Sequence, residues 1–305
     1  MPGSNLQPYP ALTSIVQHFG PATSATPDVL MFGDSVAERV SRHDQDKRTI
    51  AEMVAETLKP KSLVSITRTA QNPALYSALL VALSMQPRRP RQLIIPVNLR
   101  CFSPQWHFNP DWQLTQELAV LSAYHADRNA AVPAIADVLH DPELHQAFER
   151  IPVRYGLSKL TTVGQFRDVV RRHPASDEER ARRSREIFVF HYTHRIESDH
   201  PKLAALCECA RLASRNAIRA LIYLTPINVE AAVRHVGPAF LDEIKSNAGT
   251  IARSLATVGA QVTDWSDALP EKAFFHEDLA TEHLNQTGRL ELVRRIAKAV
   301  APWQG

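Results

Sequence analysis

Short apolar runs alternate with amphipathic stretches in the first hundred residues and again after residue 217. A strand buried on both faces of a parallel sheet is apolar at nearly every position, whereas a surface helix repeats its apolar positions every three to four residues. The predicted strands cover residues 29–32, 63–66, 93–97, 218–224 and 261–265. The predicted helices between them cover residues 37–40, 50–58, 73–85, 238–258 and 288–300. This order predicts an α/β fold with a parallel sheet and right-handed crossovers.

The alternation stops between residues 103 and 216, where the pattern is helical and strongly polar. Such a stretch is much longer than an ordinary connection between a strand and a helix, so we predict an inserted helical subdomain, a cap. Its expected helices are 111–124, 132–139 and 162–172, followed by a charged, solvated run at 177–185. The apolar run at 187–190 suits either a strand or the buried face of a helix, and we favour the helix.

The predicted organisation therefore has three parts. Residues 1–27, rich in proline, are expected to form an N-terminal arm. Residues 28–102 and 217–305 form the α/β domain, and residues 103–216 form the helical insertion.

Composition excludes several classes of protein. The 305 residues are 44% hydrophobic and 22% charged, as in ordinary globular domains, and the net charge of +3 is too small to argue for nucleic-acid binding. No run reaches the roughly 20 apolar residues that span a bilayer, and the N-terminus lacks the pattern of a signal peptide. Three cysteines form no disulfide framework. We expect a cytoplasmic protein that contacts neither nucleic acid nor membrane.

No cofactor or metal is expected. His191, His194 and His200 lie close in sequence but lack carboxylate or cysteine partners at the spacing of a metal site. The sequence does not indicate an oligomeric state.

Ser35 follows the first apolar run in the sequence Gly33-Asp34-Ser35. The carboxyl end of a parallel strand is where ligands bind in open α/β sheets, and the start of the next helix offers free backbone N–H groups. Ser35 is therefore a candidate nucleophile. Its alternative role is that of a helix N-cap, which serine and aspartate often provide.

A serine hydroxyl needs a neighbouring base before it becomes a good nucleophile. His283 lies after the last predicted strand and just before the terminal helix, so it can reach the edge of the sheet that carries Ser35. Asn98 closes the third strand, where its amide can donate to a developing oxyanion together with the Ser35 backbone. Each residue also has a purely structural interpretation, a loop histidine and a turn asparagine.

Together these residues resemble the SGNH (GDSL) hydrolase family. Gly33-Asp34-Ser35 matches the family's first motif, Asn98 its third, and His283-Leu284-Asn285 followed by Gly288 its C-terminal motif. The resemblance covers residues 28–102 and 217–300 and leaves the helical insertion outside. It implies a three-layer, flavodoxin-like parallel sheet and a serine hydrolase with an oxyanion hole made by Ser35, Asn98 and a third donor.

The sequence departs from the family pattern in two places. The family's second motif has a glycine whose backbone N–H completes the oxyanion hole, and here Ala70 or Gln71 would supply that N–H. The family's acid lies three residues before the histidine, where this chain has Ala280. We therefore predict Asp278 as the triad acid, with Glu282 or a backbone carbonyl as alternatives.

Four further residues are candidates for substrate binding because they lie beside these strand ends: Asp34, Arg100, Trp106 and Asn228. Trp106 belongs to an aromatic segment that suits a sugar or an acyl group, or alternatively anchors the insertion. The alternative role of Asn228, and the one that we favour, is that of a structural turn.

The resemblance implies an esterase that hydrolyses a short O-acyl ester, of acetyl type, on a carbohydrate or small metabolite through an acyl-enzyme. Two alternatives remain open at this point. An O-acyltransferase would use the same acyl-serine but pass the group to an alcohol, and a protein with a decayed site would only bind its ligand on this fold.

Overall fold

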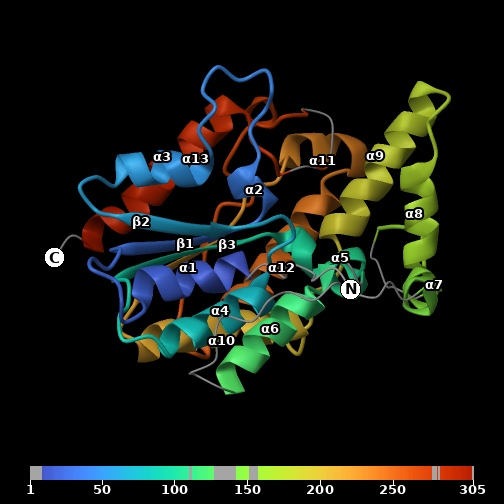
Figure 1. Cartoon of the computed structure of the whole chain (residues 1–305). Helices are drawn as coiled ribbons and strands as arrows, with labels where there is room; N and C mark the ends of the chain where they lie inside the picture. Colours follow the sequence, from blue (N-terminus) through green and yellow to red (C-terminus); the bar gives the residue numbers. More distant parts are fainter. Residues whose placement is uncertain are drawn as a thin grey trace, which may run out of the picture.

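A computed structural model describes residues 9–109, 112–126, 142–150, 157–276, 280 and 282–303. Its centre is a parallel sheet of five strands in the order β2-β1-β3-β4-β5, an arrangement of the doubly wound kind (Figure 1). The strands are β1 (Val29–Gly33), β2 (Leu63–Thr67), β3 (Gln92–Val97), β4 (Arg219–Leu224) and β5 (Thr263–Asp264). The predicted parallel α/β fold is thus confirmed.

The α-helices account for most of the remaining described residues. Those before the insertion are α1 (Pro10–Phe19), α2 (Ser35–Glu38), α3 (Ile50–Thr57) and α4 (Pro73–Ser84). Those between β3 and β4 are α5 (Pro104–Phe108), α6 (Thr115–Ala126), α7 (Pro142–Arg150), α8 (Val163–Arg171), α9 (Asp177–Tyr192) and α10 (Pro201–Arg215). Those after β4 are α11 (Val229–Val236), α12 (Ala239–Ala256) and α13 (Gln286–Val300). Short 3-10 turns η1 (Leu99–Phe102), η3 (Glu271–Ala273) and η4 (Ala301–Trp303) complete them.

The central strands β1 and β3 are buried along their whole length on both faces of the sheet, which explains their apolar runs. Successive side chains of a strand point to opposite faces. In β1, Leu30 and Phe32 belong to the core shared with α1, α4, α10 and α12, whereas Val29 and Met31 belong to the core shared with α3 and α13. Figure 1 shows these helices on the two sides of the sheet. All five residues of β1 are buried, so the strand has no polar face to present to water.

The N-terminal segment differs from the expected arm. Within residues 1–27, α1 buries Leu12, Ile15 and Phe19 completely against the sheet and α4. Its apolar spacing is helical, but the prolines around it suggested an extended segment. Pro10 stands at the start of the helix, where its missing N–H costs nothing.

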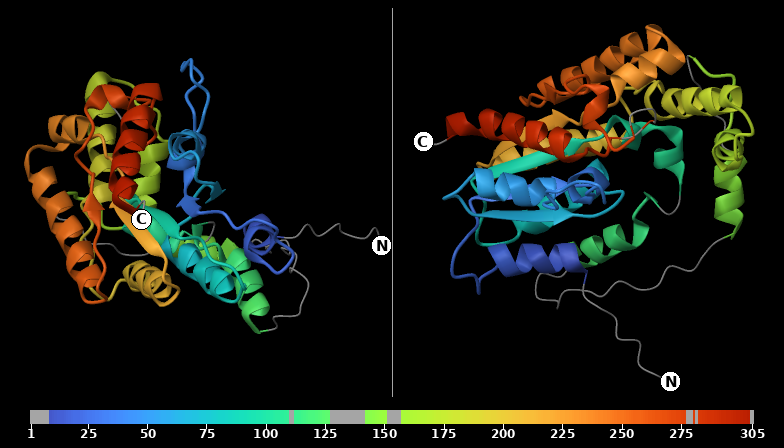
Figure 2. Two further views of the ribbon diagram at one scale, coloured as in Figure 1. Left: turned by 90° about the vertical axis from the view of Figure 1, so that its left-hand side faces the viewer. Right: turned by 90° about the horizontal axis from the view of Figure 1, so that it is seen from above.

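The insertion is also shorter than predicted. Helix α10 lies against α4 and β4, so it is the ordinary crossover that returns the chain to the sheet. Helices α7 and α8 stand at one end of the molecule, away from the sheet (Figure 2), and share a small core of their own with α9. That core contains Phe148, Phe166 and Phe190. The helix expected over residues 132–139 lies outside the described residues.

Helix α9 joins two stretches that look different in sequence. Its first half is charged and solvated, and its last turns bury Phe188, Val189 and Tyr192. The predicted helix for residues 187–190 is therefore confirmed, and it is continuous with the charged run before it.

Candidate active site

The strand end that carries Ser35 is shaped by Gly33. A Cβ on Gly33 would lie 2.6 Å from the Ala37 Cβ and 2.8 Å from the Thr67 Cγ2, so only glycine fits between β2 and α2. Asp34 is the N-cap of α2, and its carboxylate accepts from the Val36 N–H at 2.8 Å. Ser35 is the first residue of the helix, so the alternative role of N-cap belongs to Asp34.

His283 meets Ser35 across 248 residues of sequence. Its Nε2 lies 3.1 Å from the Ser35 Oγ, a distance suited to proton transfer. The His283 carbonyl accepts from the Phe275 N–H at 2.9 Å, and Leu284 pairs with Phe274 in an antiparallel bridge. The loop before α13 is thereby held against the residues that follow η3.

The start of α13 fixes the same loop from the other side. Asn285 caps the helix by accepting from the Gly288 N–H, and its Nδ2 donates to the carbonyls of Lys272 and Phe274. A Cβ on Gly288 would lie 2.2 Å from the Ala273 carbonyl oxygen, so this position also requires glycine. Asn285 and Gly288 therefore position the residue that precedes them, His283.

The environment of His283 favours a neutral imidazole. Burial is the main cause that lowers its pKa to about 3, and the positive charges of Arg100 and Arg39 act in the same direction. A neutral ring is the form that accepts a proton from a serine hydroxyl. Arg39 follows α2 directly and donates its backbone N–H to the Ser35 carbonyl, which places it one turn from the hydroxyl.

Asn98 ends β3 beside this pair. Its Nδ2 donates to the Asp34 carboxylate at 3.3 Å, and its Oδ1 accepts from the Arg100 N–H at 2.9 Å. The second hydrogen of the amide is available for a ligand, since a primary amide carries two donors. The turn interpretation and the donor interpretation are therefore compatible, because the cap uses the oxygen and a ligand would use the nitrogen.

The loop after β2 carries the candidate third donor. Gln71 donates its backbone N–H to the Arg68 carbonyl at 3.1 Å, so this amide is already engaged. Ala70 has φ of 67°, in the left-handed region that favours glycine. The alanine thus adopts the backbone of a glycine at the position where the sequence lacks one. Of the two predicted donors, the Ala70 N–H is the better candidate.

Arg100 and Glu282 form a buried ion pair beside the site. The Arg100 Nη2 lies 2.8 Å from the Glu282 Oε2, and the Glu282 side chain is fully buried. The Tyr192 hydroxyl of α9 donates to the other carboxylate oxygen. Burial raises the pKa of Glu282, and the charge of Arg100 opposes that shift. Glu282 is thus committed to partners other than its neighbour His283.

Several predicted residues have different roles from those expected. Arg100 is not an open substrate contact, because it pairs with Glu282 and stacks over the ring of Trp106. Trp106 is only 7% exposed and packs on Trp112 with ring centroids 4.4 Å apart, so it anchors the insertion. Asn228 is fully buried and caps α11 through the Ala231 N–H.

Asp34 is likewise buried and is not an open substrate contact. Its carboxylate accepts hydrogen bonds from the Val36 N–H and the Asn98 Nδ2 and so fixes the positions of both residues. The predicted acid Asp278 lies outside the described residues. Sequence reasoning missed Tyr192, which contacts Glu282 from a helix 90 residues away. Only its position at the end of an apolar run hinted at burial.

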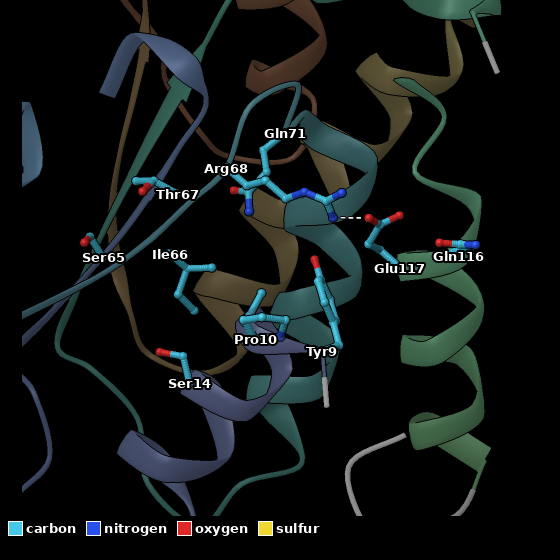
Figure 3. Close-up of a pocket in the computed structure, with 11 residues that line it drawn as sticks. Tyr9, Pro10, Ser14, Ser65, Ile66, Thr67, Arg68, Gln71, Gln116 and Glu117 are labelled. Carbon is cyan, nitrogen blue, oxygen red and sulfur yellow. Dashed lines mark hydrogen bonds and ion pairs between the residues drawn. The ribbon is translucent and has the colours of Figure 1, made fainter. Parts of the chain in front are cut away.

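A cavity of about 540 Å³ opens behind the loop after β2 (Figure 3). Its walls come from α1, β2 and α6, and an ion pair between Arg68 and Glu117 crosses it. The Tyr9 ring points toward this pair in Figure 3. Ser35, Asn98 and His283 do not line this cavity, so it is separate from the candidate active site.

Two searches of the described residues concern other kinds of site. Within this part of the chain, no group of three histidine, cysteine, aspartate or glutamate side chains is placed to hold a metal ion. No described helix has the length and apolarity needed to cross a bilayer.

Comparison with other proteins adds no assignment. No protein-family model matches this chain, and no curated protein is significantly similar to it.

Proposed function

We propose that this chain is a serine esterase of SGNH type, which hydrolyses a short O-acyl ester of a carbohydrate or small metabolite. The observation that carries the proposal is the 3.1 Å approach of the His283 Nε2 to the Ser35 Oγ. The two residues come from opposite ends of the sequence, and each is placed by local features, Gly33 and Gly288, that tolerate no side chain. A constellation held in this way has the geometry of an activated nucleophile.

In the proposed first step, the Ser35 Oγ attacks the ester carbonyl carbon while His283 accepts the hydroxyl proton. The carbonyl π electrons move to oxygen and form a tetrahedral oxyanion. Its collapse breaks the bond to the alkoxy group, and protonated His283 gives its proton to the departing alcohol. Water then attacks the acyl-serine by the same route, which releases a carboxylic acid and restores Ser35.

The proposed oxyanion hole has three donors. The Ser35 N–H lies in the first turn of α2, where backbone donors have no acceptor within the helix. The Asn98 Nδ2 and the Ala70 N–H lie at the ends of the neighbouring strands β3 and β2, on either side of β1. We assign the orientation of the imidazole to Asp278 because of its place five residues before His283.

Labelling with a fluorophosphonate probe tests the proposal directly, since the probe reacts only with an activated serine. We expect stoichiometric labelling of the wild-type protein and none of Ser35→Ala or His283→Ala. Ser103→Ala is the matched control, because Ser103 is also buried near the end of β3 and has no assigned role. Failure of the folded wild-type protein to react would favour a decayed, ligand-binding site.

A screen of p-nitrophenyl esters would then measure the preferred acyl length. Adding alcohols to the p-nitrophenyl acetate reaction separates hydrolysis from acyl transfer. A dominant alkyl acetate product would assign the chain to the acyltransferases that use the same acyl-serine. Asp278→Asn should reduce the acylation rate if that carboxylate orients His283.

A further inference from the structure

A second cavity lies at the opposite edge of the sheet from Ser35. It has a volume of about 770 Å³ and is formed by the segments that lead into β1, β2, β3 and β4, together with Trp303 beyond α13. In Figure 1 this is the edge where the C-terminal end of the chain lies. The five residues of β1 separate it from Ser35 by roughly 17 Å, at about 3.3 Å per residue. The two sites are therefore distinct.

The charged residues that line this cavity are mostly positive. Its lining residues include five cations and one carboxylate: Lys59, Lys61, Arg89, Arg91, Arg219 and Asp28. Five cations less one carboxylate give a formal charge of +4, which exceeds the +3 of the whole chain. The carboxylate of Asp28 is itself occupied by the backbone and hydroxyl of Ser62. Most of the positive charge consequently has no local counterpart in the lining.

Arg89 is one of the cations that have no carboxylate partner in the lining. Its Nε donates to the Asn216 Oδ1 at 2.9 Å, and its Nη atoms donate to backbone carbonyls that include those of Ser84 and Arg88. All of these acceptors are neutral. Burial lowers the pKa of Arg89, which means that the fold withdraws a guanidinium from water without an adjacent anion. A bound anion would supply the missing charge.

Gln92 contributes a buried polar side chain to the lining of the cavity. Its side chain is 3% exposed, and its Oε1 has no hydrogen-bond partner although it lines the cavity. Buried polar atoms in folded proteins are almost always paired. The Oε1 atom has almost no exposed surface, and the Nε2 of the same amide donates to the Trp303 carbonyl at 3.5 Å, so the side chain is part of the wall of the cavity.

We propose that this cavity binds a small phosphorylated anion, a phosphate ester or pyrophosphate with at least two negative charges. Guanidinium groups suit phosphate oxygens because their N–H donors form a planar fork. Arg91 and Arg219 bring two such groups to the lining, whereas the donors of Arg89 are engaged by neutral acceptors. The partly buried Trp303 at the wall adds an apolar surface for the organic part of an ester. The site is independent of the proposed esterase activity.

Isothermal titration of the full chain with inorganic pyrophosphate tests the site. We expect one-site binding with a Kd below about 1 mM. Arg91→Glu/Arg219→Glu should weaken binding at least tenfold, and both side chains are exposed, so the fold should tolerate the change. Arg182→Glu/Lys245→Glu is the matched control, since it makes the same charge change at exposed positions on α9 and α12.

The result that supports the site is loss of affinity in the first double variant and retention in the second. Arg91→Ala/Arg219→Ala gives the same comparison without charge reversal, in case the reversed charges disturb folding. Equal losses in both glutamate variants would mean only general attraction of anions. Absence of heat and of thermal stabilisation with the wild-type protein would overturn the proposal.

Discussion

The guanidinium of Arg100 lies 2.8 Å from the carboxylate of Glu282, and the pair joins the segment after β3 to the loop before α13. Arg100 follows Asn98 by two residues, and Glu282 directly precedes His283. Tyr192 adds a hydrogen bond from α9, so the helical insertion is attached to the same point. The structure therefore couples the candidate oxyanion donor, the candidate base and the insertion through one buried ion pair.

Loss of Arg100 should be costly because it leaves a buried carboxylate without its cation. We expect Arg100→Met to lower the free energy of unfolding by about 3–5 kcal/mol, measured by urea denaturation. The double variant Arg100→Met/Glu282→Gln removes both charges and should recover part of that loss. The exposed pair of Arg211 and Glu208 is the control, and Arg211→Met should cost under about 1 kcal/mol. Equal losses in the two single variants would contradict this account.

Asn98→Ala tests the amide as an oxyanion donor. We expect kcat to fall by about 10²–10³ with little change in KM, because the donor acts on charge that develops in the transition state. Asn216→Ala, which removes an asparagine at the end of α10, should leave kcat unchanged. A loss of only a few-fold in the Asn98 variant would restrict this residue to capping η1.

The pH dependence of kcat/KM should reflect the buried His283. Catalysis needs the neutral ring, and the pKa is lowered from 6.5 to about 3, so activity should persist through pH 5 and fall only as the pH approaches 3. Arg39→Gln removes one of the charges that lower this pKa and should move the acidic limb upward. Arg42→Gln is the control. If kcat/KM of the wild-type protein instead fell at about pH 6.5, the proposal that His283 is a buried base with a lowered pKa would be contradicted.

Gly33→Ala should disturb both stability and activity. The added methyl would meet Ala37 and Thr67 at distances below van der Waals contact, so β1 and α2 must separate. We expect a loss of about 1–3 kcal/mol in unfolding free energy, together with reduced turnover. Gly249→Ala in α12 has only the flexible end of Arg253 nearby and should be neutral or slightly stabilising. Thermal unfolding of the two variants gives the comparison.

Lys202 should make the stability depend on alkaline pH. Its ammonium is buried and donates to the carbonyls of Cys101 and Trp106, and burial lowers its pKa from 10.5 to about 8. Between these values the unfolded chain binds the proton and the folded chain does not, so folding stability rises with pH. At 1.36 kcal/mol per pKa unit, the gain is about 3 kcal/mol.

The measurement is the unfolding free energy of the wild-type protein relative to Lys202→Met at pH 7 and pH 10. The unfolding free energy of the wild-type protein, relative to that of Lys202→Met, should be larger at pH 10 than at pH 7. A difference that stays constant would show that Lys202 titrates as an ordinary exposed lysine.

The sequence by itself determined the parallel sheet and the two strand-end residues nearest the proposed chemistry. The apolar runs predicted the central strands β1, β3 and β4 because a strand buried on both faces leaves a continuous local pattern. Ser35 and Asn98 could be placed because each directly follows such a run, and parallel strands end at the same edge. These are signals within a few residues of the position they predict.

The tertiary structure decided which side chains meet and which are enclosed. From the sequence, Arg100 is a candidate substrate contact. In the structure it is paired with Glu282, which lies 182 positions away in sequence. Helix α1 looked like an arm because its burial depends on α4 and the sheet rather than on its own composition. The basic cavity likewise gathers residues from five separate segments. Ion pairs and cavities of this kind depend on distances between remote residues, and a local pattern of residue types does not contain those distances.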